Sequence, residues 1–410
     1  MRIIYIHQYF NTPKMSGGTR SYEIAKRLVD SGHKVTMITS TNKNSFEKSH
    51  HVNEIDGIKV KWLRVKYDNK MNFIQRIYSF IKFVLLSTIF SFRVKADIII
   101  ATSTPLTVCI PGIILSKFKK IPMVFEVRDL WPEMPIAIGA LRNRSLIYFA
   151  KKLEKFAYKN SSHIICLSPG MAEGVKNCGI PEHLITVIPN SSDISNFQNC
   201  EIKSDGNLKK ILNLKDQKIC LYAGSFGEVN NLEYLVKIAN EVYKYDKSII
   251  FVLVGEGKQK SNLERLAKEL RINNKNFFIL EPKPKNIIPS LFSSSDLILS
   301  IFTNLKPMWS NSANKFFDGL AAGKPVCINY GGWQYDLIKK YNIGLAIPPN
   351  DVSKSSEDII KIFKNKKLYK TMSDNSLVLA KNEFDRDKLF KKFEKVLFYS
   401  LDYHQKGKSF

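Results

Sequence analysis

Two glycine-rich turns in this sequence have the composition of anion-binding loops. The first, Met15-Ser-Gly-Gly-Thr-Arg20, follows a short apolar run and opens a helical pattern; the second, residues 221–231, repeats that arrangement. Glycine lets a ligand approach the backbone closely, and the helix that follows offers free N–H groups to an anion. The second turn is predicted to present backbone N–H groups and one side-chain amide, from Gly224, Ser225, Gly227 and Asn230. A tight strand-to-helix turn also favours glycine for structural reasons, and that interpretation stays open.

A nine-residue stretch, Phe125-Glu-Val-Arg-Asp-Leu-Trp-Pro-Glu133, gathers charges at the end of a β-rich apolar run. Charges placed where a parallel sheet ends are costly to keep for structure alone, so Glu126, Arg128 and Asp129 are candidates for chemistry. The structural alternative is a knot of salt bridges around Trp131.

The stretch from Asn311 to Val326 predicts a third kind of site, a helix with a charged N-terminus. The helix is expected to start near Ala313, which places Lys315 and Asp318 three residues apart on one face. A lysine there adds to the preference of the helix dipole for a diphosphate, and the carboxylate is suited to accept hydrogen bonds from ribose hydroxyls.

The elements that must position these segments alternate between strands and helices. Strands are expected at 2–6, 35–39, 58–65, 97–101, 122–127 and 163–167, and again at 218–223, 249–254, 276–280, 296–301, 325–329 and 344–347. Helices are expected at about 20–31, 107–119, 144–160 and 170–178, and between the later strands.

Continuous apolar strands separated by helices indicate parallel sheets covered on both faces, and two such series indicate an α/β chain of two Rossmann-like, doubly wound domains. The polar stretch 190–215 is the expected linker. The expected domains are residues 1–195 and 208–384, with a C-terminal helix in 385–410. Ligands bind beyond the carboxyl ends of parallel strands, so the active site is expected in the cleft between the domains.

Composition excludes several classes of protein. With 410 residues, 44% of them hydrophobic, the chain is long enough for two globular cores. Its six cysteines form no CxxC pair and are expected to be reduced and buried. The net charge of +26 has two open explanations, a lysine-rich coding bias or attraction to anionic membranes and diphosphates. No zinc finger, helix-turn-helix or aromatic-basic motif favours nucleic acid as a partner.

The sequence has neither the pattern of a secretory signal nor a run of about 18 uncharged apolar residues. The chain is therefore expected to be cytoplasmic or peripheral. Residues 72–94 predict an amphipathic helix with a polar stripe of Arg76, Ser79, Ser87 and Ser91, interrupted by Phe83. This helix either packs on the first sheet or docks on a membrane.

Three smaller features have simple interpretations beside the functional ones. Asp385-Arg-Asp387 has the form of a metal-binding DxD motif, but it precedes a helix and is expected to be an N-cap. His7 follows the first strand and is expected to be packed rather than to border the acceptor. Gly255-Glu-Gly257 is either a turn or a donor contact.

Together these segments resemble the retaining glycosyltransferases of family 4, which have the GT-B fold. The resemblance covers nearly the whole chain and includes the first glycine turn, Ile188-Pro-Asn190, Leu253-Val-Gly-Glu-Gly257 and Ala321-Ala-Gly-Lys-Pro-Val326. Within the family, EVRDLWPE and NKFFDGLAAGKPV are most similar to bacterial O-antigen and capsule enzymes, including L-fucosamine transferases.

The resemblance implies a nucleotide-diphosphate sugar donor, with UDP favoured, held mainly by domain two, and a lipid-diphosphate-linked saccharide acceptor held by domain one. It implies retention of anomeric configuration with no metal or other cofactor. Peripheral association with the inner face of an anionic cytoplasmic membrane is the expected location. The donor-binding residues are then Gly18, Gly224, Ser225, Gly227, Asn230, Gly255, Glu281, Asn314, Lys315 and Asp318. The acceptor-side residues are Gly17, Glu126 and Trp131, and the catalytic residues are Arg128, Asp129, Lys315 and Asp318.

The sequence departs from the family pattern at five positions. The first of two usual glutamates is Ser310 and the second is Asp318; the usual loop arginine and lysine are Ser225 and Asn230; the usual domain-one histidine is Arg128. Lys315 and Arg128 are therefore the expected cations for the diphosphate. A sugar-nucleotide epimerase or hydrolase of the same fold, and an inactive partner subunit, are the alternatives. A nicotinamide enzyme is disfavoured because the first turn lacks GxGxxG spacing.

Overall fold

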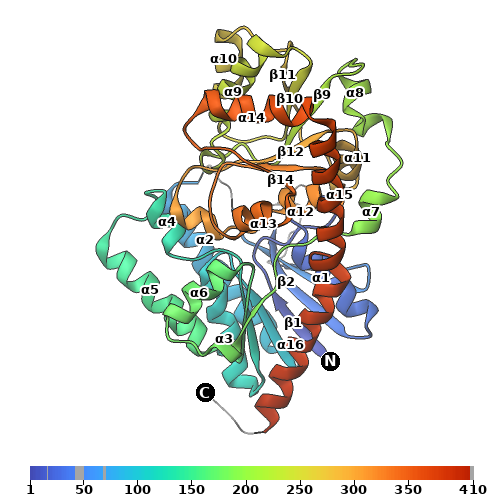
Figure 1. The fold of residues 1–410 in the computed structure, drawn as a ribbon. Helices are drawn as coiled ribbons and strands as arrows, with labels where there is room; N and C mark the ends of the chain where they lie inside the picture. Colours follow the sequence, from blue (N-terminus) through green and yellow to red (C-terminus); the bar gives the residue numbers. More distant parts are fainter. Residues whose placement is uncertain (16, 42–49, 68–70, 407–410) are drawn as a thin grey trace. The chain divides into compact units, whose positions relative to one another are not determined.

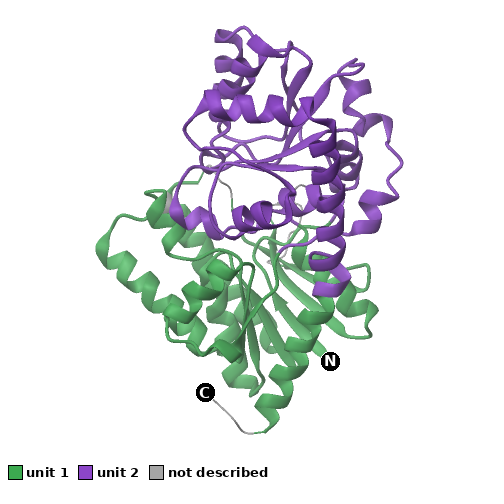
Figure 2. Ribbon diagram, in the orientation of Figure 1, with its two compact units in different colours: residues 1–12, 19–189, 390–410 green, residues 13–18, 190–389 purple. Residues whose placement is uncertain are grey.

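The computed structural model describes residues 1–15, 17–41, 50–67 and 71–406. Ser16 of the first glycine turn and the end of the expected C-terminal segment therefore lie outside the described residues. The chain divides into two compact α/β units (Figures 1 and 2). Unit 1 comprises Met1–Thr12, Thr19–Pro189 and Phe390–Phe410, and unit 2 comprises Pro13–Gly18 and Asn190–Leu389.

Unit 1 is built on an eight-stranded sheet. Its strands in spatial order are β3 (His50–Ile55), β4 (Ile58–Arg64), β2 (Lys34–Thr41), β1 (Arg2–Ile6), β5 (Ile98–Thr102), β6 (Met123–Val127), β7 (His163–Cys166) and β8 (Ile185–Val187). All neighbours pair in parallel except β3 and β4. The central strands are buried on both faces because helices cover them.

The helices of unit 1 follow the strands in the order of a doubly wound fold. They are α1 (Arg20–Asp30), α2 (Phe73–Phe92), α3 (Cys109–Lys119), α4 (Glu133–Ala137), α5 (Arg144–Lys159) and α6 (Pro169–Asn177), with short 3-10 turns η1 (Leu106–Val108) and η2 (Glu182–Leu184). Phe83 from α2 and Phe125 from β6 are fully buried in a hydrophobic core of this unit.

Unit 2 has a six-stranded, all-parallel sheet. Its order is β11 (Phe277–Leu280), β10 (Ile249–Val254), β9 (Lys218–Ala223), β12 (Leu297–Ser300), β13 (Val326–Ile328) and β14 (Gly344–Ala346). Its helices are α7 (Ile194–Gln198), α8 (Leu208–Ile211), α9 (Leu232–Tyr245), α10 (Lys260–Glu269), α11 (Ile288–Ser293), α12 (Asn314–Ala321), α13 (Trp333–Tyr341), α14 (Val352–Lys364) and α15 (Lys366–Glu383). Its 3-10 turns are η3 (Ser204–Gly206), η4 (Glu228–Asn230), η5 (Lys285–Ile287) and η6 (Lys306–Ser310).

The two parallel-sheet α/β units agree with the fold class expected from the sequence. Two strands were not expected. β3 pairs antiparallel with β4 through a turn at Asp56 and Gly57, both with positive φ, which Asp-Gly sequences favour. β8 is a three-residue strand at the edge of the sheet. The units divide between Pro189 and Asn190, at the start of the polar stretch 190–215.

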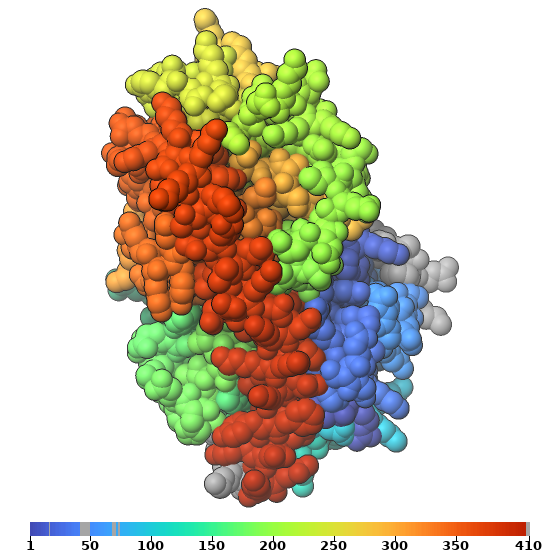
Figure 3. Space-filling model, turned by 45° about the vertical axis from the view of Figure 1, so that its right-hand side comes forward, coloured from blue at the N-terminus to red at the C-terminus, as the bar shows by residue number. Residues whose placement is uncertain are grey.

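The last helix, α16 (Arg386–Gln405), begins in unit 2 and belongs to unit 1 from Phe390 onward. Asp385 accepts a hydrogen bond from the backbone N–H of Lys388 (3.0 Å), so it is an N-cap, as expected for the Asp-Arg-Asp sequence. Farther along, Glu394 contacts His33 (3.0 Å), which follows α1. Figure 3 shows this red helix beside the blue N-terminal segments of unit 1.

Candidate functional site

The order of strands in unit 2 reverses between β9 and β12. The chain continues outward from β9 in one direction and from β12 in the other. In open parallel sheets, ligands bind at such a switch point, beyond the carboxyl ends of the two strands. The segments that emerge there are the glycine loop after Ala223 and the loop that leads from β12 to α12.

Backbone contacts hold the glycine loop against the next loop of the sheet. The N–H of Gly224 donates to the carbonyl of Val254 (3.0 Å), and the N–H of Phe226 donates to the carbonyl of Glu256 (2.7 Å). A Cβ on Gly255, whose φ is +155°, would lie 1.9 Å from the carbonyl oxygen of Gly224. Glycine is therefore required at position 255 by close backbone approach, which accounts for the Gly-Glu-Gly sequence.

Asn230, predicted to offer its amide to a ligand, lies inside the loop. It is 4% exposed, and its Nδ2 donates to the carbonyl of Ser225 (3.0 Å). The hydroxyl of Tyr222 donates to the same carbonyl (2.9 Å). Among the described residues, no recorded hydrogen bond uses the N–H groups of Ser225 and Gly227, so these two donors of the loop are available to a ligand.

Lys315 comes from the first turn of α12 and reaches the glycine loop. Its Nζ lies 3.2 Å from the hydroxyl of Tyr222 and 4.2 Å from the centre of that ring. The ring of Phe302 is 5.2 Å away. A Cβ on Gly224 would lie 3.4 Å from Nζ, so the ammonium group is beside the loop backbone. The two segments that sequence reasoning assigned to phosphate therefore meet.

The charge on Lys315 has aromatic neighbours instead of a carboxylate. Within the part of the chain that the structure describes, Lys315 forms no ion pair. Desolvation lowers its pKa to about 7. Cation–π contact stabilises the ammonium form only in part. An anion beside Nζ would favour the charged form, so the arrangement suits a phosphate.

Asp318 lies in α12 among different partners from those of Lys315. One carboxylate oxygen accepts a hydrogen bond from Ser192, and the other lies 3.0 Å from Nζ of Lys285 in η5. The side chain is only 6% exposed. The ribose contact predicted for Asp318 would have to use the remaining lone pairs of oxygens that already accept a donor.

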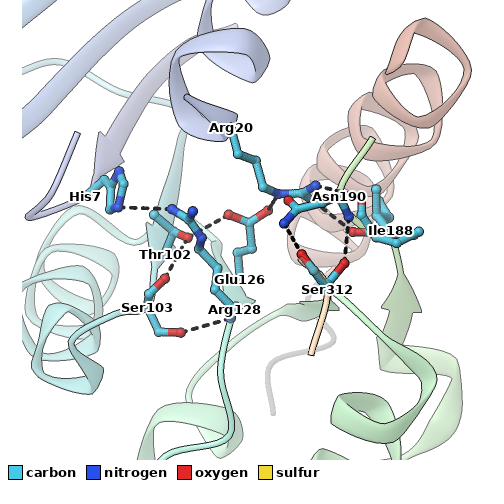
Figure 4. Close-up of polar contacts among 10 residues, drawn as sticks. His7, Arg20, Thr102, Ser103, Glu126, Arg128, Ile188, Asn190 and Ser312 are labelled. Carbon is cyan, nitrogen blue, oxygen red and sulfur yellow. Dashed lines mark hydrogen bonds and ion pairs between the residues drawn. The ribbon is translucent and has the colours of Figure 1, made fainter. Parts of the chain in front are cut away.

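The remaining predicted donor residues are dispersed. Glu281 follows β11, is 72% exposed at its side chain and pairs with Lys260. Asn314 is the first residue of α12, and the preceding Ser312 accepts a hydrogen bond from the N–H of Asn190 (3.0 Å; Figure 4). Gly18, a predicted donor residue, and Gly17, predicted on the acceptor side, both belong to Pro13–Gly18, the short segment that is part of unit 2.

Unit 1 has its own switch point between β1 and β5, and Arg128, which follows the next strand β6, contacts the residues that emerge there. Figure 4 shows its guanidinium group directed toward His7, with Nη1 3.1 Å from Nε2 of the imidazole. The backbone N–H of Arg128 donates to Oγ of Ser103 (3.0 Å). Because guanidinium only donates, His7 must accept at Nε2. Burial and Arg128 hold the pKa of His7 well below its usual value, so the imidazole is neutral.

Glu126, predicted to face the acceptor, is instead fully buried in an ion pair. Its carboxylate accepts from Nε of Arg20 (2.9 Å) and from Oγ1 of Thr102 (2.6 Å). Burial alone would raise the pKa of Glu126, but Arg20 and Arg128 hold it below the usual value. Arg20 also donates to the carbonyls of Ile188 (2.9 Å) and Pro189 (2.7 Å), which ties the residues after β8 to α1 (Figure 4).

Two neighbours of Arg128 differ in their surroundings. Asp129 is exposed, and desolvation nevertheless raises its pKa to about 6, although Arg128 opposes the shift. Trp131 is partly buried and packs against the core of unit 1. The ion pair of this segment therefore forms at Glu126 and not around Trp131.

Sequence reasoning missed Tyr222, Phe302 and Lys285. Tyr222 lies two residues before Gly224 on β9, and Phe302 lies two residues after β12. An aromatic residue at the carboxyl end of each switch-point strand was a usable signal. Lys285 had none, because its approach to Asp318 joins segments 33 residues apart.

Two family descriptions match the chain. The family described as "Glycosyltransferase Family 4" matches residues 17–196, and "Glycosyl transferases group 1" matches residues 204–377. The first match covers most of unit 1 and the second most of unit 2.

Curated relatives match part of the chain. One, from Escherichia coli K12, is named "Putative colanic acid biosynthesis glycosyl transferase WcaI" and is 27% identical over 214 residues, 51% of each chain. Another, the alpha-D-kanosaminyltransferase of Streptomyces kanamyceticus, is 22% identical over 172 residues, 42% of this chain and 43% of the relative. The chain thus spans about half the length of these relatives.

Solved structures match nearly the whole chain in fold. HepE from Anabaena in complex with UDP and glucose has a TM-score of 0.73 and 17% identity, covering 97% of this chain and 100% of that one. Sucrose-phosphate synthase from Thermosynechococcus elongatus has a TM-score of 0.77 and 15% identity, with 96% and 98% covered. WaaG, a glycosyltransferase involved in lipopolysaccharide biosynthesis, has a TM-score of 0.71 and 16% identity, with 96% and 99% covered.

Proposed function

We propose that this chain, which belongs to glycosyltransferase family 4 and has the GT-B fold, transfers a sugar from a nucleotide-diphosphate donor to an acceptor hydroxyl. The observation that carries the proposal is the position of Lys315. Its ammonium group lies beside the glycine loop at the switch point of unit 2, between aromatic rings and without an ion-pair partner among the described residues. A diphosphate supplies the negative charge that this site lacks.

In the proposed reaction the anomeric configuration is retained and no metal is required. The acceptor oxygen attacks the anomeric carbon on the side of the leaving group, the bond from that carbon to the diphosphate oxygen breaks, and the acceptor proton passes to the departing diphosphate. The products are the glycoside and the nucleoside diphosphate. Lys315 and the N–H groups of Ser225 and Gly227 stabilise the charge that develops on the diphosphate.

Asp318 and Lys285 are proposed to act as a pair on the donor side. Because both carboxylate oxygens of Asp318 already accept a donor, we assign it the role of holding Lys285 in place. Exchange of Asp318 for alanine should then raise the donor KM more than it lowers kcat. An unchanged donor KM would remove the pair from donor binding.

On unit 1 we propose that Arg128 and Asp129 face the acceptor. His7 and Ser103 fix the orientation of Arg128, so its charge is positioned before the acceptor binds. Asp129 is accessible and is suited to accept a hydrogen bond from the acceptor hydroxyl.

The finer identity of the substrates rests on similarity. Solved structures of this fold contain UDP, and relatives are named for colanic acid and lipopolysaccharide biosynthesis. We therefore propose UDP as the nucleotide and a lipid-diphosphate-linked saccharide as the acceptor, in O-antigen or capsule synthesis at the inner face of the cytoplasmic membrane. The proposed sugar is an N-acetylated deoxyhexosamine such as L-FucNAc.

The first experiment is a thermal-shift panel with UDP, GDP, TDP and CMP at matched concentrations. A ligand at 100 times its Kd stabilises the folded state by about 2.7 kcal/mol, which is a readily measured shift. A shift with one nucleotide identifies the donor class, and the absence of any shift would contradict the donor site.

Turnover of the matching nucleotide sugar with and without acceptor then separates three activities. Sugar transfer requires the acceptor, whereas a hydrolase or epimerase turns over the nucleotide sugar without it. An inactive partner subunit shows no turnover in either case. Under transfer conditions, Lys315→Ala should lower kcat/KM by about 100-fold or more, the loss typical of one charged donor at a developing anion. Lys324→Ala changes another partly buried lysine of unit 2, whose pKa is also lowered by desolvation, and is the control that should retain turnover.

A further inference from the structure

Helix α2 of unit 1 carries its apolar side chains on the outside. Along its exposed side, Ile74 is 77% exposed, Leu85 is 57% exposed and Ile89 is 59% exposed. Tyr78 and Ile81 extend the same row, at 65% and 54%. These positions recur every three or four residues, so they form one continuous stripe along the helix.

The opposite side of α2, which packs on unit 1, carries the serines. Ser79, Ser87 and Ser91 are buried with Phe83 between them. Ser79 donates to the carbonyl of Lys66 (2.6 Å), and Ser87 donates back to Val84 (3.2 Å). The stripe that the sequence predicts as the polar side is therefore the inner side. A surface helix usually packs its apolar side on the core and exposes its polar side to water, and α2 has the reverse arrangement.

The segment Ile74–Phe92 is long and apolar enough to cross a membrane by length and composition alone. Its inner side, however, belongs to the core of unit 1, since Phe83 is fully buried there and α2 packs on α3, β2 and β4. If α2 left unit 1 to cross a bilayer, that core would be exposed. The arrangement fits a helix that lies along a surface.

Two further helices continue the apolar surface. The ring of Phe118, at the end of α3, meets that of Phe92 of α2 at 4.8 Å between centres, and Phe118 is 71% exposed. The neighbouring Lys117 lies over the ring of Phe156 of α5 at 5.8 Å. Helix α5 exposes two more aromatic side chains, Tyr148 at 56% and Phe149 at 63%.

The exposed charged side chains of these three helices are all basic. Helices α2, α3 and α5 contain a single acidic residue, Glu154, which is buried and bonded to Tyr158. The basic residues exposed on α3, α5 and the turn after α3 are Lys117, Lys120, Arg144, Lys151, Lys152, Lys155 and Lys159. A basic, aromatic and apolar surface is the composition that binds the headgroup region of anionic bilayers.

We propose that α2, the end of α3 and α5 form a membrane-docking surface that lies in the plane of an anionic lipid bilayer. Its charge argues against a second copy of the chain as the occupant, because a two-fold contact would place like charges opposite one another. The inference deepens the proposed function, on which its biological purpose rests, since a lipid-linked acceptor is reached at such a surface.

The first test is sedimentation of the full chain with vesicles of phosphatidylglycerol and phosphatidylcholine. We expect binding, and we expect Ile81→Gln/Leu85→Gln/Ile89→Gln to weaken it by roughly 100-fold or more, because three inserted side chains are lost. The control Tyr245→Gln/Val378→Gln changes equally exposed side chains of unit 2, at 72% and 56%, and should bind like the parent. Absence of binding by the parent chain overturns the proposal.

The second test separates the basic contribution from the apolar one. Lys151→Gln/Lys152→Gln/Lys155→Gln should weaken binding by roughly 100-fold, at about fivefold per lysine near an anionic surface. The loss should vanish on vesicles of phosphatidylcholine alone. Equal binding by parent and variant to anionic vesicles would contradict the electrostatic part of the inference.

The depth of α2 in the bilayer and the oligomeric state of the chain distinguish surface docking from insertion across the membrane and from contact with a second copy. A Leu85→Trp variant should be quenched best by bromine near the headgroup end of the acyl chains, about 5–10 Å deep. Quenching strongest at the bilayer centre would show insertion across the membrane. A dimer that Leu85→Gln dissociates, without vesicle binding, would assign the surface to a second copy; either result overturns the proposal.

The same preparations distinguish failure of this inference from failure of the proposed function. A thermal shift with UDP reports on unit 2 and requires no lipid. Loss of vesicle binding with a retained UDP shift would refute the surface alone. Vesicle binding without any nucleotide shift would refute the donor site alone.

Discussion

The ammonium group of Lys315 and the carboxylate of Asp318 belong to one helix but have different chemical surroundings. Lys315 meets Tyr222 and Phe302, whereas Asp318 meets Ser192 and Lys285. A charge beside aromatic rings keeps its capacity for an incoming anion, while a charge in an ion pair is already compensated. For this reason we expect Lys315 to govern donor binding at the scale of single residues.

The depressed pKa of Lys315 predicts that donor binding takes up a proton. Above pH 7 the free lysine is mostly neutral, since its pKa is about 7, and a bound diphosphate raises that pKa. UDP affinity should therefore fall as pH rises from about 7.5 to 9, by up to about tenfold per pH unit. Calorimetry in buffers of different ionisation enthalpy measures the proton directly. The Lys315→Met variant should bind UDP weakly, with an affinity that does not change with pH. If the UDP affinity of the parent chain did not change with pH either, the role of Lys315 in donor binding would be refuted.

The buried pair of Glu126 and Arg20 predicts a stability effect. In Glu126→Gln, Arg20 remains buried without its charge partner, so unit 1 should lose about 3–5 kcal/mol of unfolding free energy at pH 7. The folded pKa of Glu126 is lowered, so the difference from the parent should shrink as pH falls through that value. Denaturant titrations measure it. Glu182→Gln, a carboxylate that is 82% exposed, is the control and should change stability by less than about 1 kcal/mol.

At the scale of elements, the proposed donor site depends on two loops that touch through their backbones. Substitution of Gly255 by alanine places a methyl group 1.9 Å from the carbonyl oxygen of Gly224, so the glycine loop must move. We expect a stability loss of about 1–3 kcal/mol and weaker UDP binding, measured by thermal shift. Gly179→Ala shares the positive φ but has no atom within 4 Å, so it should leave UDP binding unchanged. Equal effects of the two variants would exclude loop contact as the cause.

Helix α2 shows at the same scale how an element can be predicted from the sequence while the side that faces the core is not. Its length and periodicity were evident from the sequence, whereas its inner side carries Ser79, Ser87 and Ser91. A hydroxyl can be buried when it donates to a backbone carbonyl, as Ser79 does to Lys66. Side-chain polarity alone therefore did not reveal which side faces the core.

At the scale of the whole molecule, unit 1 includes the end of the chain. Phe393 of α16 is fully buried, whereas Phe398 on the same helix is 48% exposed. Phe393→Ala should lower the unfolding free energy of unit 1 by about 3–5 kcal/mol, and Phe398→Ala by clearly less. Calorimetry with and without UDP measures both, and the UDP shift should persist because its proposed site lies in residues 190–389. Loss of that shift in Phe393→Ala would show that the units are not independent.

The sequence by itself determined the architecture. The bounds of β1, β9 and β10 agree with the predicted strands residue for residue. Each is a continuous apolar run bounded by polar or glycine residues, and such a run is buried best as a strand of a parallel sheet that is covered on both faces. It also singled out the glycine loop and Lys315 as candidate phosphate contacts, and the structure places them side by side. The edge strands β3 and β8 were missed because they are short, only partly buried and depend on pairing with a neighbour.

Only the tertiary structure decided how the charges are used. Glu126 is paired with Arg20 across 106 residues, and Lys285 meets Asp318 across 33. The side-chain amide of Asn230 donates to the carbonyl of Ser225 in the same loop. The sequence shows which groups are charged or polar, but whether such a group is compensated depends on what lies within about 3 Å of it. Chain segments distant in sequence supply that neighbour, and only packing brings them together.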